Sequence, residues 1–570
     1  MNNKFSTISF GRKDPIIRVI KALDSAGVRS KVMPAGIALI VGDKNKLLGI
    51  ATDGDIRRGL GRGVDLSAPI ESVMNRNPVV VKGPISRNAV MPSVREIMRG
   101  RVGKGYVEKI LVLNDEKQVI DIISSFNILQ ISDARFRKIG IVGLGYVGLT
   151  LAVTLSELGF KVTGIDSNKR VVRELKKGRT HVVERGLSKM LEEQIGANFN
   201  VEHDFKPDSR CDVYILAVGT PVKKDEPDMS QLKSAAQRVG SVLKVGDLVV
   251  LRSTAPIGTT RGLVIPLLEK ESGLKAGDDF LVSFAPERTI EGQALEELKN
   301  LPQVIGGLNH ASTELASGIF GFLTKSIVSV ESLEEAEMVK LVNNTYRDVT
   351  FSFANELSLI ARAWRIDTRR VIEAANYGYE RSRVPYPSPG VGGYCLTKDP
   401  LIFINSSKKK GHDPRLFRTA RTVSGLVLES ICADVFDFLE KRKIAIPKAR
   451  IFIMGFAFKG APATADVRGS TTNDLIRFLK NGGIKNLEGY DTNVSEADIA
   501  GMGAKPSKDV SRSVKSADVV IVMTNNRDFE SVDIAGLMSK RKKPVLFFDA
   551  WDLYSRDAIA RLPHIVRKYL

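Results

Sequence analysis

One cysteine in the sequence stands where a nucleophile would be expected. Cys395 follows the glycine-rich stretch 387–393 and precedes residues that can begin a helix. Glycine allows the backbone to approach a ligand closely, and the N-terminus of a helix favours a thiolate over a thiol. The alternative interpretation of a lone cysteine is a small buried hydrophobic residue. Other parts of the sequence are needed to distinguish this from a nucleophile.

Polar residues that could assist such a nucleophile occur at helical spacing. Lys340 and Asn344 lie four residues apart in the stretch 331–367, which contains neither proline nor glycine. Their side chains would therefore lie on one face of a long helix, one turn apart. Asp399 would lie one turn beyond Cys395 if a helix begins at about residue 396. Taken alone, the lysine and the amide could equally be solvated surface residues.

The most specific motif is a glycine-rich turn between a strand and a helix. The predicted strand 138–142 runs into a GxGxxG turn, an apolar helix pattern follows at 149–158, and the next predicted strand, 161–165, ends in an aspartate. This order is the dinucleotide-binding fingerprint. The acid would accept from a ribose 2′-hydroxyl and repel a 2′-phosphate, which favours NAD over NADP. The expected cofactor-binding residues of this unit are Gly143, Gly145, Tyr146, Val147, Gly148 and Asp166.

Three further predicted strands end in polar residues. In a doubly wound sheet, ligands lie beyond the carboxyl ends of the strands. Two threonines would therefore lie on the cofactor side, and two acids four residues apart become candidate site groups, although alone they could be solvated. The strands and the residues that follow them are 211–218 with Thr220, 248–251 with Thr254, and 280–284 with Glu287 and Glu291.

The last part of the chain, from residue 446, repeats the alternation of strands and helices. Its predicted strands are 449–455, 486–491, 516–524 and 544–548. This pattern indicates a second nucleotide-binding sheet, and because it lacks the glycine motif we expect it to hold a different ligand.

The first 135 residues contain two similar phrases. Thr52 and Asp55 follow one apolar strand, and Ser124 and Asn127 follow another. This spacing places polar groups at a helix start, where they could hold a ribose and a phosphate. The unit resembles a pair of cystathionine-beta-synthase-type (CBS) repeats, which often bind adenine nucleotides and regulate an attached enzyme. A pair kept only for dimerisation is the alternative.

Length and composition limit the class of protein. A chain of 570 residues exceeds a single core and should hold about three to five domains. The net charge of +20 is spread along the chain, and its densest basic clusters lack aromatic residues for base stacking, so we expect no nucleic-acid partner. No signal peptide or membrane span is predicted, which favours a cytoplasmic protein. Three cysteines without a close pair argue against disulfides or a metal site.

With these pieces in order, residues 137–570 resemble the nucleotide-sugar dehydrogenases, the family of UDP-glucose and UDP-N-acetylhexosamine 6-dehydrogenases. The resemblance implies an α/β protein with two Rossmann-like doubly wound sheets, joined by a long central helix and a helical dimerisation region and preceded by the α+β CBS pair. It also implies a homodimer or higher homo-oligomer. The implied domains are 1–135, 137–330, 331–445 and 446–570. The matching phrases are Gly143–Gly148, Val218–Pro221, Ser253–Thr254, Pro286–Arg288, Lys340 with Asn344, Gly392–Asp399 and Gly455–Lys459.

The family's chemistry would be the four-electron oxidation of the C6 alcohol of a UDP-sugar to a carboxylate by two NAD⁺. By resemblance, Cys395 would carry a thiohemiacetal and then a thioester, while Lys340 and Asn344 would stabilise the oxyanions. Thr254 and Asp399 would position a water molecule. Glu291 would assist as a base, with Glu287 near the same site. The residues that the resemblance assigns to substrate binding are Lys340, Asn344, Arg381, Gly392 and Lys459, of which Arg381 often acts across a dimer interface in the family.

The identity of the sugar depends on fewer residues. The phrase Pro286–Thr289 followed by Gly292 looks like the N-acetylhexosamine branch, whereas Tyr394 stands where that branch frequently has histidine. We expect UDP-GlcNAc, UDP-ManNAc or UDP-GalNAc, with UDP-glucose as the alternative. A two-electron dehydrogenase of the hydroxyacid type, and a non-enzymatic nucleotide sensor or nucleic-acid binder, are the competing hypotheses.

Overall fold

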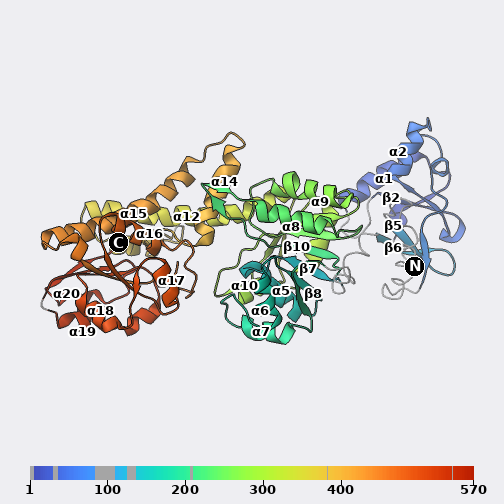
Figure 1. The fold of residues 1–570 in the computed structure, drawn as a ribbon. Helices are drawn as coiled ribbons and strands as arrows, with labels where there is room; N and C mark the ends of the chain where they lie inside the picture. The colour runs from blue at the N-terminus through green and yellow to red at the C-terminus, as the bar shows by residue number, and fades with distance from the viewer. Residues whose placement is uncertain are drawn as a thin grey trace. The chain divides into compact units, whose positions relative to one another are not determined.

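The computed structural model describes residues 5–29, 36–83, 109–124, 137–205, 210–381, 383–541 and 543–570. The chain forms two compact units, Met1–Phe136 and Arg137–Leu570 (Figure 1). None of the helices in the described part is both long enough and apolar enough to span a bilayer.

The first unit contains two three-stranded sheets with the same arrangement. In each sheet the first two strands are parallel and the third is antiparallel to the second. Apolar residues of both sheets, including Leu39, Ile50 and Leu111, share one core. The elements are β1 (Ser9–Gly11), α1 (Ile16–Arg29), β2 (Ile37–Val41), β3 (Leu47–Thr52), α2 (Asp53–Gly61), β4 (Val80–Lys82), β5 (Lys109–Leu113) and β6 (Val119–Ser124).

The second unit begins with an eight-stranded sheet in the order β16-β15-β14-β13-β10-β7-β8-β9. All neighbouring strands are parallel except β14 and β15. Strands such as β7, β10 and β13 are buried along their whole length, as expected for apolar strands covered on both faces. The strands are β7 (Ile139–Val142), β8 (Val162–Ile165), β9 (Phe199–Glu202), β10 (Val213–Leu216), β13 (Leu248–Leu251), β14 (Leu281–Phe284), β15 (Gln303–Gly307) and β16 (Ile327–Val330).

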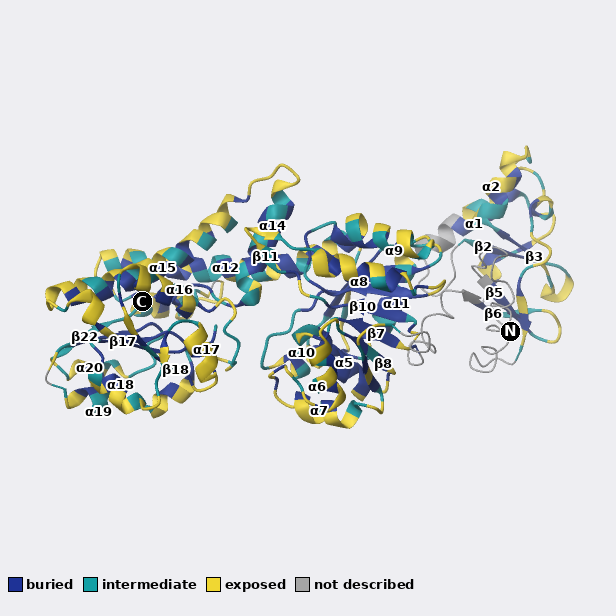
Figure 2. Ribbon diagram, viewed as in Figure 1, coloured by how far each residue is buried: buried dark blue, intermediate teal, exposed yellow. Residues whose placement is uncertain are grey.

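Helices cover this sheet, with exposed outer faces and buried inner faces (Figure 2). They are α5 (Tyr146–Glu157), α6 (Lys169–Lys176), α7 (Leu187–Gln194), α8 (Ser230–Gly240), α9 (Ile265–Ser272), α10 (Ala294–Asn300) and α11 (His310–Phe320), and a small hairpin is formed by β11 (Val222–Lys223) and β12 (Glu226–Pro227).

A second sheet closes the chain, with six parallel strands in the order β19-β18-β17-β20-β21-β22. Its strands are β17 (Arg450–Met454), β18 (Asn486–Tyr490), β19 (Lys505–Pro506), β20 (Val519–Val522), β21 (Val545–Asp549) and β22 (Ile565–Lys568). Its helices are α16 (Thr471–Asn481), α17 (Glu496–Gly501), α18 (Val510–Ser516), α19 (Ile534–Ser539) and α20 (Arg556–Ala560).

Long helices join the two sheets (Figure 1). α12 (Leu333–Ala363) has 31 residues and packs against α14 (Tyr394–Lys408) and α15 (Arg415–Lys441), while α13 (Thr368–Asn376) follows it. Ser332 caps the N-terminus of α12 by accepting from the Glu335 amide. The prediction of two Rossmann-like sheets and a long central helix is confirmed.

Candidate active site

The glycine turn has the geometry that a dinucleotide requires. Gly143 has a φ of +94°, and a Cβ on Gly148 would lie only 1.8 Å from the Gly143 carbonyl oxygen. A Cβ on Gly145, which caps α5, would meet nothing within 4 Å, so there is open space at the helix N-terminus. Tyr146 and Val147 form the first turn of α5. These residues fit a pyrophosphate held by backbone amides, and NAD is the dinucleotide they would hold.

The other predicted cofactor residues lie beyond the carboxyl ends of neighbouring strands. The Asp166 carboxylate follows β8 and accepts from the backbone amides of Leu144 and Asn168, each at 2.8 Å. The Thr220 hydroxyl donates to the carbonyl oxygen of Thr254 at 2.6 Å, which joins the ends of β10 and β13. The structure therefore places Asp166 against the glycine turn and brings the two threonines together.

Cys395 opens into a cleft of about 330 Å³ that residues from both sheets and the central helices line. The thiol is exposed and lies in the first turn of α14, which begins at Tyr394, two residues earlier than expected. Gly393 has a φ of +93°, and a Cβ there would lie 2.7 Å from the Phe458 ring, so the close approach requires glycine.

The ionisation of Cys395 differs from the expectation of a favoured thiolate. The protein around the cleft desolvates the sulfur and raises its pKa, and the negative charges of Asp399 and Glu291 act in the same direction. Lys340 and Lys398 oppose this shift. Desolvation outweighs the helix terminus, so the free enzyme holds mainly a thiol that must lose a proton for nucleophilic attack.

Lys340, Asn344 and Asp399 are brought together on one side of this thiol. Lys340 and Asn344 both line the cleft from α12. The Lys340 ammonium donates to the backbone carbonyl of Glu287, and the Asn344 amide donates to Asp399 at 2.6 Å. Asp399 is buried and also pairs with Lys398 at 2.7 Å. Asp399 therefore fixes the Asn344 amide.

The two glutamates predicted near the site occupy different environments. Glu287 is buried, its carboxylate pairs with Arg252 at 2.6 Å, and it does not line the cleft. Burial favours the neutral acid, but Arg252, the Thr289 amide and Lys340 overcome it and lower the pKa of Glu287. Glu291 lines the cleft, and burial with nearby Asp466 raises its pKa. Glu291 is thus the acid with access to the cleft.

The loop after the first strand of the second sheet contributes a lysine to the cleft. Lys459 donates to the backbone carbonyl of Glu291 at 2.7 Å, and Gly392 lines the same cleft. Burial lowers the pKa of Lys459, and the like charge of Arg347 lowers it further. Arg381, by contrast, is exposed and does not line this cleft. Its guanidinium carbon lies 5.2 Å from the centre of the Tyr379 ring.

Two residues that sequence reasoning missed belong to this region. Arg347, one turn after Asn344 on α12, lines the cleft, and within the described residues its guanidinium forms no hydrogen bond or ion pair. Its i+3 spacing from Asn344 could have identified it. Glu184, before α7, accepts from Tyr146, Gly292 and Ala294. No local pattern marks this buried glutamate.

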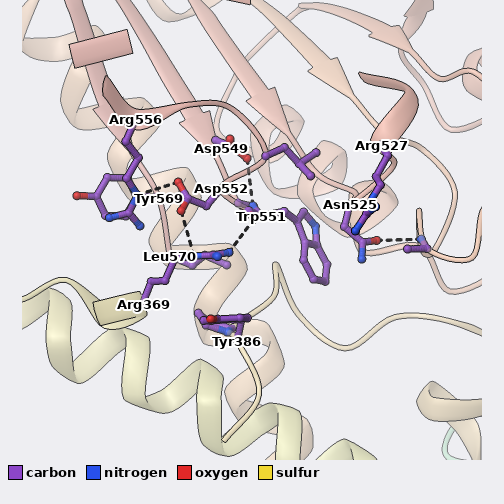
Figure 3. Close-up of a pocket in the computed structure, with 14 residues that line it drawn as sticks. Arg369, Tyr386, Asn525, Arg527, Asp549, Trp551, Asp552, Arg556, Tyr569 and Leu570 are labelled. Carbon is purple, nitrogen blue, oxygen red and sulfur yellow. Dashed lines mark hydrogen bonds and ion pairs between the residues drawn. The ribbon is translucent and has the colours of Figure 1, made fainter. Parts of the chain in front are cut away.

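A second hollow of about 360 Å³ adjoins the cleft through the shared residues Ala461, Asn525 and Trp551 (Figure 3). It lies at the carboxyl ends of β20 and β21, where a doubly wound sheet binds ligands. Asp552 accepts from Arg369 and Arg556 at its wall, so these two guanidinium groups are already paired.

The nucleotide residues predicted in the first unit are described only in part. Thr52 and Asp55 form a capping box at the start of α2, and the Thr52 hydroxyl donates to Asp55 at 2.7 Å. Their spacing thus has a structural role. Ser124 ends β6, but its side chain and Asn127 lie outside the described residues.

Comparisons with known proteins cover the second unit. The family models of the UDP-glucose/GDP-mannose dehydrogenase family match in three parts, the NAD binding domain at 137–324, the central domain at 334–424 and the UDP binding domain at 452–556. The UDP-N-acetyl-D-mannosamine dehydrogenase of Pyrococcus horikoshii is 33% identical over 397 residues, which are 70% of this chain and 91% of that protein.

Solved structures agree with this match. A structure of UDP-D-ManNAc dehydrogenase from Pyrococcus horikoshii has a TM-score of 0.69 at 30% identity and covers 76% of this chain and 98% of its own. A UDP-glucose dehydrogenase from Pyrobaculum islandicum has a TM-score of 0.65 at 28% identity and covers 76% of this chain and 97% of its own. The chain therefore belongs to the UDP-glucose/GDP-mannose dehydrogenase family.

Proposed function

We propose that the protein oxidises the C6 alcohol of a UDP-N-acetylhexosamine to the carboxylate with two NAD⁺. The observation that carries this proposal is the position of Cys395 at the cleft between the two nucleotide-type sheets, with Lys340, Asn344 and Glu291 around it. The relatives named UDP-N-acetyl-D-mannosamine dehydrogenase support the N-acetylhexosamine. The likeness to a UDP-glucose dehydrogenase keeps UDP-glucose as the second candidate.

Each step of the oxidation would use particular residues of the cleft. NAD⁺ held at the glycine turn would supply the hydride acceptor for each of the two oxidations. The Cys395 thiolate adds to the C6 aldehyde after the first oxidation, which gives a thiohemiacetal; loss of the second hydride gives a thioester, and water then releases the carboxylate and the thiol. The Lys340 ammonium and the Asn344 amide hold the C6 oxygen while it carries negative charge.

The acids would handle the water step. We propose that Glu291, whose pKa is raised, removes the proton from the attacking water. Asp399 fixes Asn344, and with Thr254 we propose that it places the water. Glu287 would act only indirectly, by positioning Lys340. Its backbone carbonyl accepts from Lys340, while its carboxylate is bound to Arg252.

The UDP group would lie along the second sheet. Lys459 and Arg347 are two cations near one another, and an anionic diphosphate between them would relieve their repulsion. The hollow that contains Trp551 and Tyr386 provides aromatic surfaces for the uracil ring (Figure 3). Arg381 would serve a neighbouring protomer's site rather than this one.

The test is a count of NADH against product for a panel of UDP-sugars. We expect two NADH per sugar, with the highest kcat/KM for an N-acetylhexosamine. Cys395→Ser should abolish carboxylate formation while NAD affinity stays unchanged. One NADH per sugar, or full carboxylate formation by Cys395→Ser, would identify a two-electron dehydrogenase instead. Absence of turnover together with salt-sensitive DNA binding would favour the non-enzymatic alternative.

We propose that residues 1–135 form the regulatory CBS pair, followed by the cofactor region 137–330, the central region 331–445 and the substrate region 446–570. The repeated strand arrangement of the two small sheets supports a pair of like modules. The ligand would be an adenine nucleotide at Thr52, Asp55, Ser124 and Asn127. Calorimetry of the full-length protein with AMP and ATP, compared with Asp55→Ala, tests this; equal heats from both proteins would leave only a structural role.

We also propose a homo-oligomer built on α12. On the side opposite the polar contacts, this helix exposes Tyr346 (70%), Phe353 (59%) and Ile360 (54%), which a second copy would cover. Light scattering of the wild type and of Phe353→Glu measures the mass. A wild-type monomer would contradict the proposal.

A further inference from the structure

A buried carboxylate, that of Glu184, lies between the cofactor turn and the segment that carries Glu291. Glu184 is 8% exposed and accepts hydrogen bonds from residues of two other elements. One oxygen accepts from the Tyr146 hydroxyl and from the Gly292 amide, the latter at 2.7 Å, and the other accepts from the Ala294 amide at 3.1 Å. Among the described residues, every hydrogen bond that this carboxylate accepts comes from a donor in one of those two segments.

These contacts form a continuous link from the cofactor turn to the second sheet. Tyr146 is the first residue of α5, whose N-terminus would face the cofactor, and its hydroxyl oxygen also accepts from the Gly292 amide at 3.2 Å. Gly292 follows Glu291 directly, and the Glu291 carbonyl accepts from Lys459 of the second sheet. A displacement of Glu184 would therefore be transmitted to the cofactor turn and to Glu291 together.

We propose that Glu184 is a positioning residue that holds the first turn of the cofactor helix and the Glu291 segment in one arrangement, so that cofactor affinity and thioester hydrolysis both depend on it. The second half of this inference rests on the proposed function, since it requires Glu291 to act on a thioester. The first half rests on the Tyr146 contact alone.

Electrostatics provide a signature that a merely structural carboxylate would lack. The negative charge of Glu184 contributes to the raised pKa of Glu291, after desolvation and Asp466. Removal of this charge should lower the pKa of Glu291. Because a general base must be ionised, the acid limb of the activity profile should move to lower pH. The groups that face Glu291 are Asp466, Arg468, Lys459, Glu184, Tyr146 and Cys395.

The decisive variant is Glu184→Gln, because glutamine has a similar shape but presents an NH₂ group to backbone and phenol donors. Calorimetry without any sugar should show NAD affinity lower by about 10- to 150-fold, the effect of losing a hydrogen bond to a charged carboxylate. With the UDP-sugar, steady-state turnover should fall by about 10- to 100-fold. A rapid burst of two NADH per site should remain, followed by accumulation of a mass adduct on Cys395.

Two further variants keep the test decisive. Tyr146→Phe removes only the hydroxyl and should reproduce the loss of NAD affinity even if Glu184→Gln does not fold. Glu192→Gln, an exposed glutamate on α7, serves as the matched control and should behave as wild type. Wild-type NAD affinity in Tyr146→Phe, or an unshifted pH limb without a Cys395 adduct in Glu184→Gln, would overturn the inference. Absence of turnover in the wild type would overturn the proposed function. The NAD affinities of the variants would then still test whether cofactor binding depends on Glu184.

Discussion

Replacement of Arg252 by methionine should destabilise the first sheet of the second unit far more than an ordinary substitution. The Arg252 side chain is fully buried and donates to Glu287 at 2.6 and 3.2 Å and to Gln303 at 3.2 Å. Removal of one partner of a buried ion pair leaves an uncompensated charge and costs about 3 to 5 kcal/mol. For a domain of about 150 to 250 residues, this lowers the Tm by about 6 to 20 °C.

Thermal denaturation of a double-mutant cycle measures the effect. Arg252→Met and Glu287→Gln should each lower the Tm, and the double variant should lose less than the sum of both because no unpaired charge remains. The pair's contribution to stability should also disappear in acid. The folded protein lowers the pKa of Glu287, so the stability present above its ordinary pKa of 4.5 is lost as the pH falls through the folded pKa. If Glu287→Gln had the wild-type Tm but no turnover, Glu287 would be a reacting group, and the structural reasoning would be refuted.

Three further predictions concern other contacts. Burial raises the pKa of Glu337 to about 6. The stability that the protonated acid contributes below its ordinary pKa of 4.5 is therefore lost as the pH rises through about 6. The Tm of the wild type should fall relative to that of Glu337→Gln over this pH range, and parallel curves would contradict this. Gly393→Ala should lower kcat by tenfold or more because its Cβ would strike Phe458, whereas Gly411→Ala, equally strained at φ +81° but without a neighbour, should keep wild-type kcat. Arg347→Leu should weaken UDP binding by about 10- to 100-fold in calorimetry and leave NAD affinity unchanged; unchanged UDP affinity would exclude a diphosphate contact.

The sequence predicted those parts of the fold that depend on short-range patterns. The glycine turn at 143–148, the strand before it and Asp166 follow from one local motif, and all three lie as predicted. The buried parallel strands are continuous apolar runs with clear ends. The long helix α12 was predictable because no proline or glycine interrupts its sequence.

The remaining contacts join residues that are distant in sequence, and no local pattern determines them. Arg252 and Glu287 are 35 residues apart, and Glu184 and Gly292 are 108 apart. The antiparallel strand β15 was not predicted, because strand direction depends on the path of the chain between strands. The raised pKa of Cys395 was not predicted either. The thiol is desolvated by residues that come together only in the folded cleft, and the helix start alone does not reveal this.

The polar contacts of α12 have a consequence for which insertions and deletions the chain can tolerate. Lys340, Asn344, Asp348, Ser352 and Asn355 each contact a different neighbouring residue outside the helix, at successive steps of four, four, four and three residues. The helix spans about 46 Å, and one inserted residue turns everything beyond it by about 100°. Insertion or deletion of one residue between Lys340 and Asn355 would rotate the contact residues after that point away from the face that carries the contact residues before it. Length variation among functional variants should therefore be confined to the loops, and the interval from Lys340 to Asn355 should be constant.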